Sequence, residues 1–485
     1  MIKKITNIFQ LLNHIEFGVT FIRLILLFGL FFSQIQATEI TLIKDSLTRS
    51  NNNCILLLSG HPDSKFCQQQ LKHVVAQTKN VFPGKNANIV TGQRVGGIFA
   101  VYQNDLECYI SCGYKDLNFK KRLNEHSVFE IASVTKTFTA TILGVMQIQK
   151  KLNSLDFVKP NLPLGFTFAS NEMNVTYQQL ATFSGGFSYS DPPNAINPST
   201  TTFPQSSFEA DINNLNPAEP PSTTVYTVNP LQYLPTVNVY SNSSYGLLGQ
   251  ILANIHYPGV AFNDSVLNAL YCDFILNPLR MSKTNVCTPS QTKNKRCTSY
   301  NSICKFQAGW LILMDFVPGY RVNNTSHIFE SAPFFPYQPW AAAGSLRSTA
   351  LDMMKYMKMI LGVTNTSKLT DGANLGLSGN YYLPIPQGQK ARINHPAPNS
   401  PAYQGWAWVV LPENANKNPN KIQFKLGGHS GFNSFIGVDM TLGYSIVILT
   451  NTGPDHKGRV NPNVDSSLQR IGVNIMVETA KERIN

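Results

Sequence analysis

The chain has 485 residues, of which 43% are hydrophobic and 14% charged, so it can bury a large core and does not have the composition of a disordered protein. Its 39 basic and 27 acidic residues give a net charge of +12, which favours anionic surfaces and is compatible with peripheral membrane association. It contains no basic run with interleaved aromatic residues, and this argues against a nucleic-acid partner.

The N-terminal segment has the pattern of a secretion signal. Basic residues precede the apolar run Leu24–Phe32, and the small residue Ala37 follows it. Because a membrane span needs about 20 apolar residues, this shorter run predicts a signal peptide over residues 1–37. An uncleaved anchor is the alternative. We therefore expect a secreted or periplasmic protein.

The cysteine spacing predicts disulfides, because the chain has eight cysteines and an export signal. Cys108 and Cys112 lie in one strand-like segment, about 13 Å apart along an extended chain, which is too far for a mutual bond. No Cys-x-x-Cys motif or neighbouring histidine indicates a metal site. Two pairs are close enough in sequence to close loops: Cys54 with Cys67, and Cys287 with Cys297.

The first half of the chain predicts strands followed by a helix. Residues 38–90 are rich in asparagine, lysine and glutamine, and the sequence assigns them no role. Segments 96–103 and 106–114 are predicted as adjacent strands, separated by an Asn-Asp turn. After the segment 129–133, apolar residues recur at helical spacing on one face: Phe138, Ile142, Val145 and Met146. Residues 184–235 are crowded with proline, serine, threonine and asparagine, which predicts long loops.

The second half predicts helices and then strands. Residues 244–255 and 348–361 have helical patterns, and Thr349 and Asp352 stand at capping-box spacing. An amphipathic helix through Leu468, Ile471, Ile475 and Met476 ends the chain. Four strands precede this helix: 405–412, 421–427, 432–439 and 444–451.

Strands at both ends of the mature chain, joined by short turns, predict an α/β (α+β) fold with one antiparallel sheet, terminal helices and a helical lobe. We expect the sheet lobe at residues 91–132 and 395–485, and the helical lobe at 133–394. Together these form a predicted catalytic domain over residues 91–485.

A candidate nucleophile occurs in a Ser-x-x-Lys motif. The chain has this motif at Ser133–Lys136, Ser290–Lys293 and Ser302–Lys305, but Ser133 alone stands where a strand-like segment enters an apolar-faced helix. Lys136 lies one helical turn further, so its amine can reach the Ser133 hydroxyl. A serine hydroxyl needs such a base to attack. The alternative is that Ser133 caps the helix and Lys136 is a surface residue.

The second candidate element is Tyr240-Ser241-Asn242. A tyrosine near a cation can act as a general base, and an asparagine can hold both a lysine amine and a substrate amide. The same pattern at Tyr102 lies at a strand end ahead of Ser133, so we set it aside. The alternative for Tyr240 is a half-buried loop aromatic.

The third candidate element has two registers, Lys425-Leu426-Gly427 and His429-Ser430-Gly431. Apolar residues alternate with Gln423 and Lys425, so Lys425 projects from the polar face of a strand. Gly427 through Gly431 then forms the predicted turn, with His429 inside it. We prefer Lys425 and keep His429 as the alternative.

Together, these elements resemble the β-lactamase-related serine hydrolases, which include class C β-lactamases, D-alanyl-D-alanine carboxypeptidases and esterases. The resemblance rests on FEIASVTKTFTA, VYSNSSYGLLGQIL, AAAGSLRSTALDMM and KLGGHSGFNSFIGVD, and covers roughly residues 90–475. It implies the β-lactamase/penicillin-binding-protein fold without metal or organic cofactor. The carboxypeptidase/endopeptidase branch is the most similar.

The resemblance also implies a role for each candidate residue. Ser133 would form an acyl-enzyme, and Lys136 and Tyr240 would transfer its proton. Asn242 would orient Lys136 and the substrate amide, and Lys425 would keep Tyr240 deprotonated or attract a carboxylate. The backbone N–H groups of Ser133 and Gly428 would form the oxyanion hole. Gly427 and Ser430 are the other residues predicted at the oxyanion and substrate-binding site.

Two departures from the family pattern bear on the substrate. Leu426 replaces the usual threonine or serine that binds the substrate carboxylate, so carboxylate recognition should weaken unless Ser430 substitutes. Phe183 replaces a usual histidine, which we interpret as structural. The expected substrates are small cell-wall peptides ending in D-Ala-D-Ala, then esters, then β-lactams, with peptidoglycan as a candidate partner. The alternative is a penicillin-binding sensor with little turnover, or an envelope scaffold.

Overall fold

A computed structural model describes residues 53–82, 93–118, 120–167, 174–187, 208, 240–286, 315–322, 329–332, 338–378, 383–384, 402–414, 419–453 and 467–484. Residues 53–485 form one compact unit. The predicted signal peptide, most of the predicted loop segment 184–235, the Cys287–Cys297 pair and the two other Ser-x-x-Lys motifs lie outside the described residues. In the described part of the chain, no helix is both long enough and apolar enough to cross a membrane.

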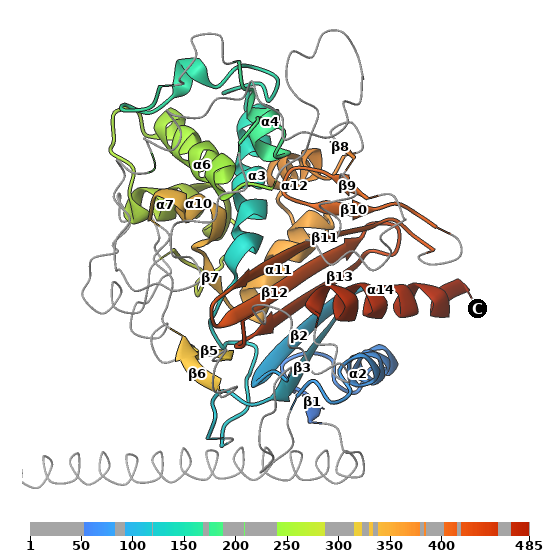
Figure 1. Cartoon of the computed structure of the whole chain (residues 1–485). Helices are drawn as coiled ribbons and strands as arrows, with labels where there is room; N and C mark the ends of the chain where they lie inside the picture. Colours follow the sequence, from blue (N-terminus) through green and yellow to red (C-terminus); the bar gives the residue numbers. More distant parts are fainter. Residues whose placement is uncertain are drawn as a thin grey trace, which may run out of the picture. The chain divides into compact units, whose positions relative to one another are not determined.

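Strands from both ends of the compact unit form one antiparallel sheet, as the sequence predicts (Figure 1). Among the described residues its order is β1-β3-β2-β13-β12-β11-β10-β9-β8. The junction of the two ends is the pairing of β2 with β13. The strands are β1 (Cys54–Leu56), β2 (Gly96–Gln103), β3 (Leu106–Gly113), β8 (Leu383–Pro384), β9 (Tyr403–Gln404), β10 (Val409–Leu411), β11 (Ile422–His429), β12 (Phe432–Asp439) and β13 (Tyr444–Thr450).

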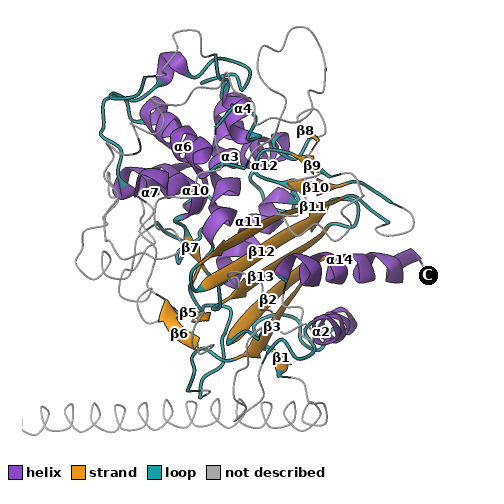
Figure 2. Ribbon diagram, in the orientation of Figure 1, coloured by secondary structure: helices purple, strands orange, loops and turns teal. Residues whose placement is uncertain are grey.

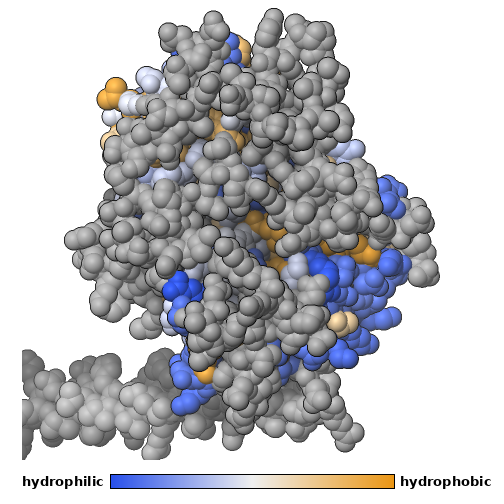
Figure 3. Space-filling view, in the orientation of Figure 1, coloured by the Kyte–Doolittle hydropathy of each residue, from blue (hydrophilic) through white to orange (hydrophobic). Residues whose placement is uncertain are grey.

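Helices cover both faces of the sheet (Figure 2). On one face lie α2 (Lys65–Gln77) and α14 (Leu468–Ile484), and Gly472 of α14 leaves room for the Phe435 ring of β12. On the other face lies α11 (Ala350–Ile360), where the Met354 sulfur accepts from the Ser445 hydroxyl of β13. Hydrophilic side chains cover the outer surface of α2 and α14 in Figure 3. These outer helices therefore seal the sheet from solvent.

The helical lobe is held together by close backbone contacts. A Cβ at Gly144 of α3 (Thr135–Ile148) would lie 1.9 Å from the Gly372 carbonyl oxygen of α12 (Ser367–Leu375). A Cβ at Gly249 of α6 (Asn242–His256) would lie 2.0 Å from the Cβ of Ala342 in α10 (Ala341–Gly344). Glycine at both positions therefore sets the helix spacing. The predicted apolar face of α3 is buried in this core.

Smaller elements complete the described part. They are α4 (Tyr177–Ala181), α7 (Asp264–Tyr271), η1 (Ala132–Val134), η2 (Lys159–Asn161), the π-helical turn η3 (Cys272–Leu276), η4 (Gln338–Trp340), β4 (Phe129–Glu130), β7 (Arg347–Ser348), β5 (Gly319–Val322) and β6 (Phe329–Ala332). β4 pairs with β7, and β5 with β6.

Most predicted strands are observed, but β11 corrects one boundary. The strand continues to His429, so the turn is Ser430–Gly431 rather than Gly427 to Gly431. The reason is that Gly428 pairs with Asn433 of β12, while Gly431 takes the turn conformation at φ 102°. The predicted strand 405–412 is also shorter, since β10 covers Val409–Leu411.

The disulfides correct one predicted pair and confirm another expectation. Cys54 bonds Cys112 and Cys67 bonds Cys108, so the predicted Cys54–Cys67 bond is wrong, while Cys108 and Cys112 indeed do not bond each other. Cys54 stands directly opposite Cys112 in the β1–β3 ladder, which explains the pairing. Cys272 is also disulfide-bonded. Cys54 and Cys67 belong to the segment 38–90, to which the sequence analysis assigns no role, and both disulfides join this segment to β3.

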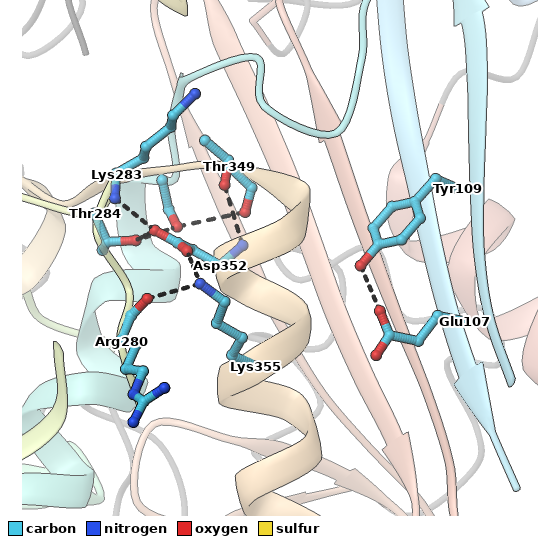
Figure 4. Close-up of polar contacts among 9 residues, drawn as sticks. Glu107, Tyr109, Arg280, Lys283, Thr284, Thr349, Asp352 and Lys355 are labelled. Atoms are coloured by element: carbon cyan, nitrogen blue, oxygen red, sulfur yellow. Dashed lines mark hydrogen bonds and ion pairs between the residues drawn. The ribbon is translucent and has the colours of Figure 1, made fainter. Parts of the chain in front are cut away.

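The start of α11 is fixed by Asp352 (Figure 4). The Thr349 side chain accepts from the Asp352 backbone N–H at 3.1 Å, which confirms Thr349 as the predicted N-cap. The Asp352 carboxylate accepts from the Lys283 N–H at 2.8 Å, the Thr284 hydroxyl at 3.1 Å and the Lys355 ammonium at 2.7 Å. The first two of these bonds hold the start of α11 against Lys283 and Thr284. The same figure shows the Tyr109 hydroxyl donating to Glu107 at the sheet.

We predict that the double variant Cys54→Ala/Cys112→Ala has a free energy of unfolding lower by about 3 kcal/mol, because the retained Cys67–Cys108 bond shortens the loop that Cys54–Cys112 closes in the unfolded chain. The two cysteines are 58 positions apart. Urea unfolding of the oxidised proteins measures the difference. The circular dichroism spectrum at 25 °C should match that of the wild type as the control for native structure, and an unchanged unfolding midpoint would contradict the prediction.

Candidate active site

The turn that carries Ser133 joins β4 to α3 through η1. Ala132 has φ 45°, a left-handed conformation that a non-glycine residue adopts only at a cost. Held in this turn, Ser133 stands half-buried at the strand-to-helix junction expected from the sequence. Its hydroxyl faces two other candidate residues.

Lys136 is fully buried and holds the centre of the site. Its ammonium donates to the Ser133 hydroxyl at 3.0 Å, to the Asn242 side-chain oxygen at 2.6 Å and to the Ala343 carbonyl at 2.7 Å. A buried charge is tolerated when its donors are satisfied, and these three acceptors match the three protons. The alternative of a surface lysine is therefore excluded.

Tyr240 contacts both the nucleophile and two cations. Its hydroxyl donates to the Ser133 oxygen at 2.7 Å. The Lys136 and Lys425 nitrogens lie 4.9 and 4.7 Å from its ring centre. Nearby positive charge favours the phenolate form of a tyrosine. The Phe183 ring packs at 4.8 Å behind it, consistent with a structural role for Phe183.

Asn242 is aligned by the start of α6. Ser241 caps this helix by accepting from the Ser244 N–H at 3.2 Å, and Asn242 begins it. Tyr240 precedes the cap, so one helix start brings both side chains to Lys136. This explains why the Tyr-Ser-Asn spacing in the sequence corresponds to one site.

Lys425 comes from β11 and is 5% exposed. Burial lowers the pKa of Lys425 to about 7, and no acidic side chain of the described residues offsets it. Lys425 therefore changes charge near neutral pH.

Gly427 brings β11 directly against the nucleophile turn. A Cβ there would lie 2.2 Å from the Ile131 carbonyl oxygen and 3.1 Å from the Ser133 nitrogen. Only a glycine permits this approach. Gly428 follows and is exposed to solvent. Gly427 thus borders the Ser133 backbone nitrogen.

Two candidates from the third motif lie away from this cluster. Ser430 is 2% exposed in the turn after β11, about 10 Å of strand beyond Gly427. His429 faces Glu130 at 2.8 Å rather than Tyr240 or Lys136. Tyr102, set aside in the sequence, donates to Asp105 at a strand end. The register with Lys425 is therefore the one that reaches Ser133.

The Ala343 carbonyl, which accepts from Lys136, was not predicted as part of the site. Ala343 lies in the segment AAAGSLRST, which is part of the family resemblance. Every residue has a backbone carbonyl, however, so the sequence has no signal that distinguishes this acceptor. The described residues contain no group of three or more histidine, cysteine, aspartate or glutamate side chains placed to hold a metal ion.

Known proteins share this fold. A β-lactamase family model matches residues 71–466. The β-lactamase of Escherichia coli strain K12 is 22% identical over 439 residues, which cover 84% of this chain and 96% of the relative. A β-lactamase structure from Sulfitobacter sp. EE-36 superposes with a TM-score of 0.58 at 16% identity and covers 87% of this chain and 100% of its own.

A further solved structure, the β-lactamase/D-alanine carboxypeptidase from Pseudomonas syringae, has a TM-score of 0.56 at 17% identity and covers 84% of this chain and 97% of its own. At these identities the structures support the fold alone, and they confirm the fold class expected from the sequence. Because the family model spans most of the chain, the protein belongs to the β-lactamase family of serine hydrolases.

Proposed function

We propose that this hydrolase is exported and acts through an acyl-enzyme on Ser133. The observation that carries the proposal is the position of the Ser133 oxygen, 3.0 Å from the Lys136 nitrogen and 2.7 Å from the Tyr240 hydroxyl. A nucleophile within hydrogen-bond reach of two possible bases has the geometry that covalent catalysis requires.

The proposed reaction has two halves. The Lys136–Tyr240 pair takes the hydroxyl proton as the Ser133 oxygen bonds to the substrate carbonyl carbon. The proton then passes to the leaving amine or alcohol as its bond to that carbon breaks, which leaves an ester on Ser133. Water adds to this ester with the same pair as base and releases the acid. General acid–base catalysis of this kind contributes typically about 10²–10⁴ in rate.

The transition-state charge falls on the former carbonyl oxygen. The backbone N–H groups of Ser133 and Gly428 would stabilise this oxyanion, and one such donor is worth about 3–4 kcal/mol. The Asn242 side chain, whose oxygen accepts from Lys136 at 2.6 Å, would orient Lys136 and the substrate amide. Lys425 would hold Tyr240 close to its phenolate form or attract a substrate carboxylate.

For the substrate we favour a peptide ending in D-Ala-D-Ala, with peptidoglycan as its source. The Pseudomonas syringae relative, described as a β-lactamase/D-alanine carboxypeptidase, supports this choice. An ester is the second candidate, because Leu426 offers no hydroxyl for a carboxylate and Ser430 lies in the turn after β11. β-lactams come third. The disulfides support a secreted or periplasmic location, since such bonds persist in oxidising compartments.

We predict that intact-mass spectrometry detects a covalent adduct on the protein and that Ser133→Ala abolishes it, because the variant lacks the attacking oxygen. The probes are penicillin, a D-Ala-D-Ala pentapeptide and a short-chain ester. Release of D-alanine with a transient adduct indicates a carboxypeptidase, and ester cleavage without a peptide adduct indicates an esterase. A long-lived penicillin adduct without turnover of any substrate indicates a sensor.

Folding of Ser133→Ala is checked by its thermal unfolding, which should match that of the wild type. Persistent labelling of this variant would identify a different nucleophile. Absence of labelling and turnover in the wild type with all three probes would favour a binding or scaffold protein.

We also predict that kcat/KM falls as pH rises through about 7, because Lys425 is an ammonium below that pH and an amine above it. The proposed role of Lys425 requires the ammonium. Lys425→Met should lack this limb of the pH profile and lose about 10²-fold in kcat/KM at pH 6. The matched control is Lys421→Met, an exposed lysine of the same segment, which should keep the wild-type profile. If kcat/KM of Lys425→Met still decreased above about pH 7, a group other than Lys425 would cause the decrease.

A further inference from the structure

A buried charged cluster lies behind the nucleophile turn. It consists of Glu130 of β4, Arg347 of β7 and His429 at the end of β11, whose side chains are 2%, 1% and 5% exposed. One Glu130 oxygen lies 2.5 Å from an Arg347 nitrogen, and the other lies 2.8 Å from the His429 Nε2. Three separate strands therefore meet at one carboxylate.

The Glu130 carboxylate is compensated by its two neighbours. Burial alone would raise the pKa of Glu130, but Arg347 and His429 outweigh it, so the pKa lies below the ordinary value. The two ring nitrogens of His429 face two acceptors, the Glu130 carboxylate and, at 3.0 Å, the Ser430 carbonyl. Glu130 is thus a buried carboxylate held between the Arg347 guanidinium and the His429 ring.

The cluster lies between the two elements that would form the oxyanion hole. Glu130 precedes Ser133 by three residues, and His429 directly follows Gly428. A second polar side-chain contact along this boundary is made by the Ser434 hydroxyl, which donates to the Ile131 carbonyl at 2.8 Å. Gly427 has no side chain to interlock with the turn. The spacing of strand and turn must therefore be held by such flanking contacts.

The relevant half of β11 has pairing support on one side. The β10–β11 ladder ends at Phe424, whereas Lys425 through His429 continue to pair with β12. The nucleophile turn packs on the face of this half, because a Cβ at Gly427 would meet the Ile131 carbonyl oxygen and the Ser434 hydroxyl of the paired strand β12. With a ladder on one side among the described residues, this half can shift relative to the turn unless a side chain holds it.

Arg347 extends the cluster to the other side of the site. Its guanidinium donates to the carbonyls of Val286 and Ser345. Ser345 lies two residues after Ala343, whose carbonyl accepts from Lys136. Glu130 therefore connects the acceptor of Lys136 with the strand of Gly428.

We propose that His429 is a positioning residue, and that its contact with Glu130 holds β11 against η1 at the spacing that the Ser133 and Gly428 N–H groups need to bind an oxyanion. This inference rests on the proposed acyl-serine function. It assigns a role in transition-state binding to a residue that contacts neither the nucleophile nor the substrate. Because the oxyanion forms only during the reaction, its loss should affect kcat more than KM.

The test compares His429→Leu with His429→Gln. Leucine fills the space without a donor, whereas the glutamine amide can still donate to Glu130. On the ester or peptide that the wild type cleaves, His429→Leu should lose about 10- to 100-fold in kcat with KM within about twofold, less than the full loss of one oxyanion donor. Binding of phenylboronic acid, which forms a tetrahedral adduct on the serine oxygen, should weaken by a similar factor. His429→Gln should recover most of both.

The matched control is His256→Leu. His256 also pairs with a carboxylate, since its Nε2 lies 3.0 Å from an Asp273 oxygen, and it lies about 21 Å along α6 from Asn242. This variant should keep the wild-type kcat and boronate affinity. If His429→Leu does not fold, His429→Asn replaces it, because asparagine is too short to reach Glu130 and should be less active than His429→Gln.

Wild-type kcat and boronate affinity in the folded Leu or Asn variant would overturn the inference. Equal losses in the Gln variant and the folded Leu or Asn variant would also overturn it, since the donor to Glu130 would then be irrelevant. Ser133→Ala, assayed in parallel, separates the two proposals. Retained turnover in Ser133→Ala refutes the acyl-serine function itself, whereas an inactive Ser133→Ala beside a normal His429→Leu refutes only the role of His429.

Discussion

The site depends first on the burial of one ammonium group. Removing the charge of Lys136 from water is costly unless each of its protons finds an acceptor. The acceptors are the Ser133 hydroxyl, the Asn242 side-chain oxygen and the Ala343 carbonyl, which come from η1, α6 and α10. Three elements far apart in sequence must therefore assemble before the lysine is satisfied. The close approach of α6 and α10 at Gly249 is part of that assembly, and the catalytic spacing follows from it.

A second constraint is the contact between the sheet and the nucleophile turn. The strand that supplies Lys425 reaches the Ser133 turn through Gly427, where any side chain would collide with the Ile131 carbonyl. The Lys425 nitrogen then lies 4.7 Å from the centre of the Tyr240 ring, and the Lys136 nitrogen lies 4.9 Å from it. Tyr240 thus bridges the helical lobe and the sheet. Movement of either would change the charge around its hydroxyl and the distance to Ser133.

The sequence predicted the features that have a local signature. Ser133 and Lys136 stand at a helix start, Tyr240 and Asn242 flank another, and Lys425 follows from strand alternation, so each could be located from its neighbours. The disulfide partner of Cys54 could not, because it depends on the register between β1 and β3. The glycine pair after Lys425 suggested a turn, yet pairing with β12 keeps it extended. The Ala343 carbonyl and the Glu130–Arg347 pair arise from tertiary contacts that no spacing along the chain reveals.

The charge of Lys425 links substrate chemistry to protonation. Burial is the cause of its low pKa, and no acidic side chain of the described residues counteracts it. A substrate carboxylate beside Lys425 would supply the missing negative charge and raise the pKa, because an opposite charge favours the protonated form. Binding an anionic peptide above pH 7 would then take up a proton, while binding a neutral ester would not. With Leu426 providing no hydroxyl to share the carboxylate, this electrostatic gain has to compensate for the absent hydrogen bond if the enzyme is to act on peptides.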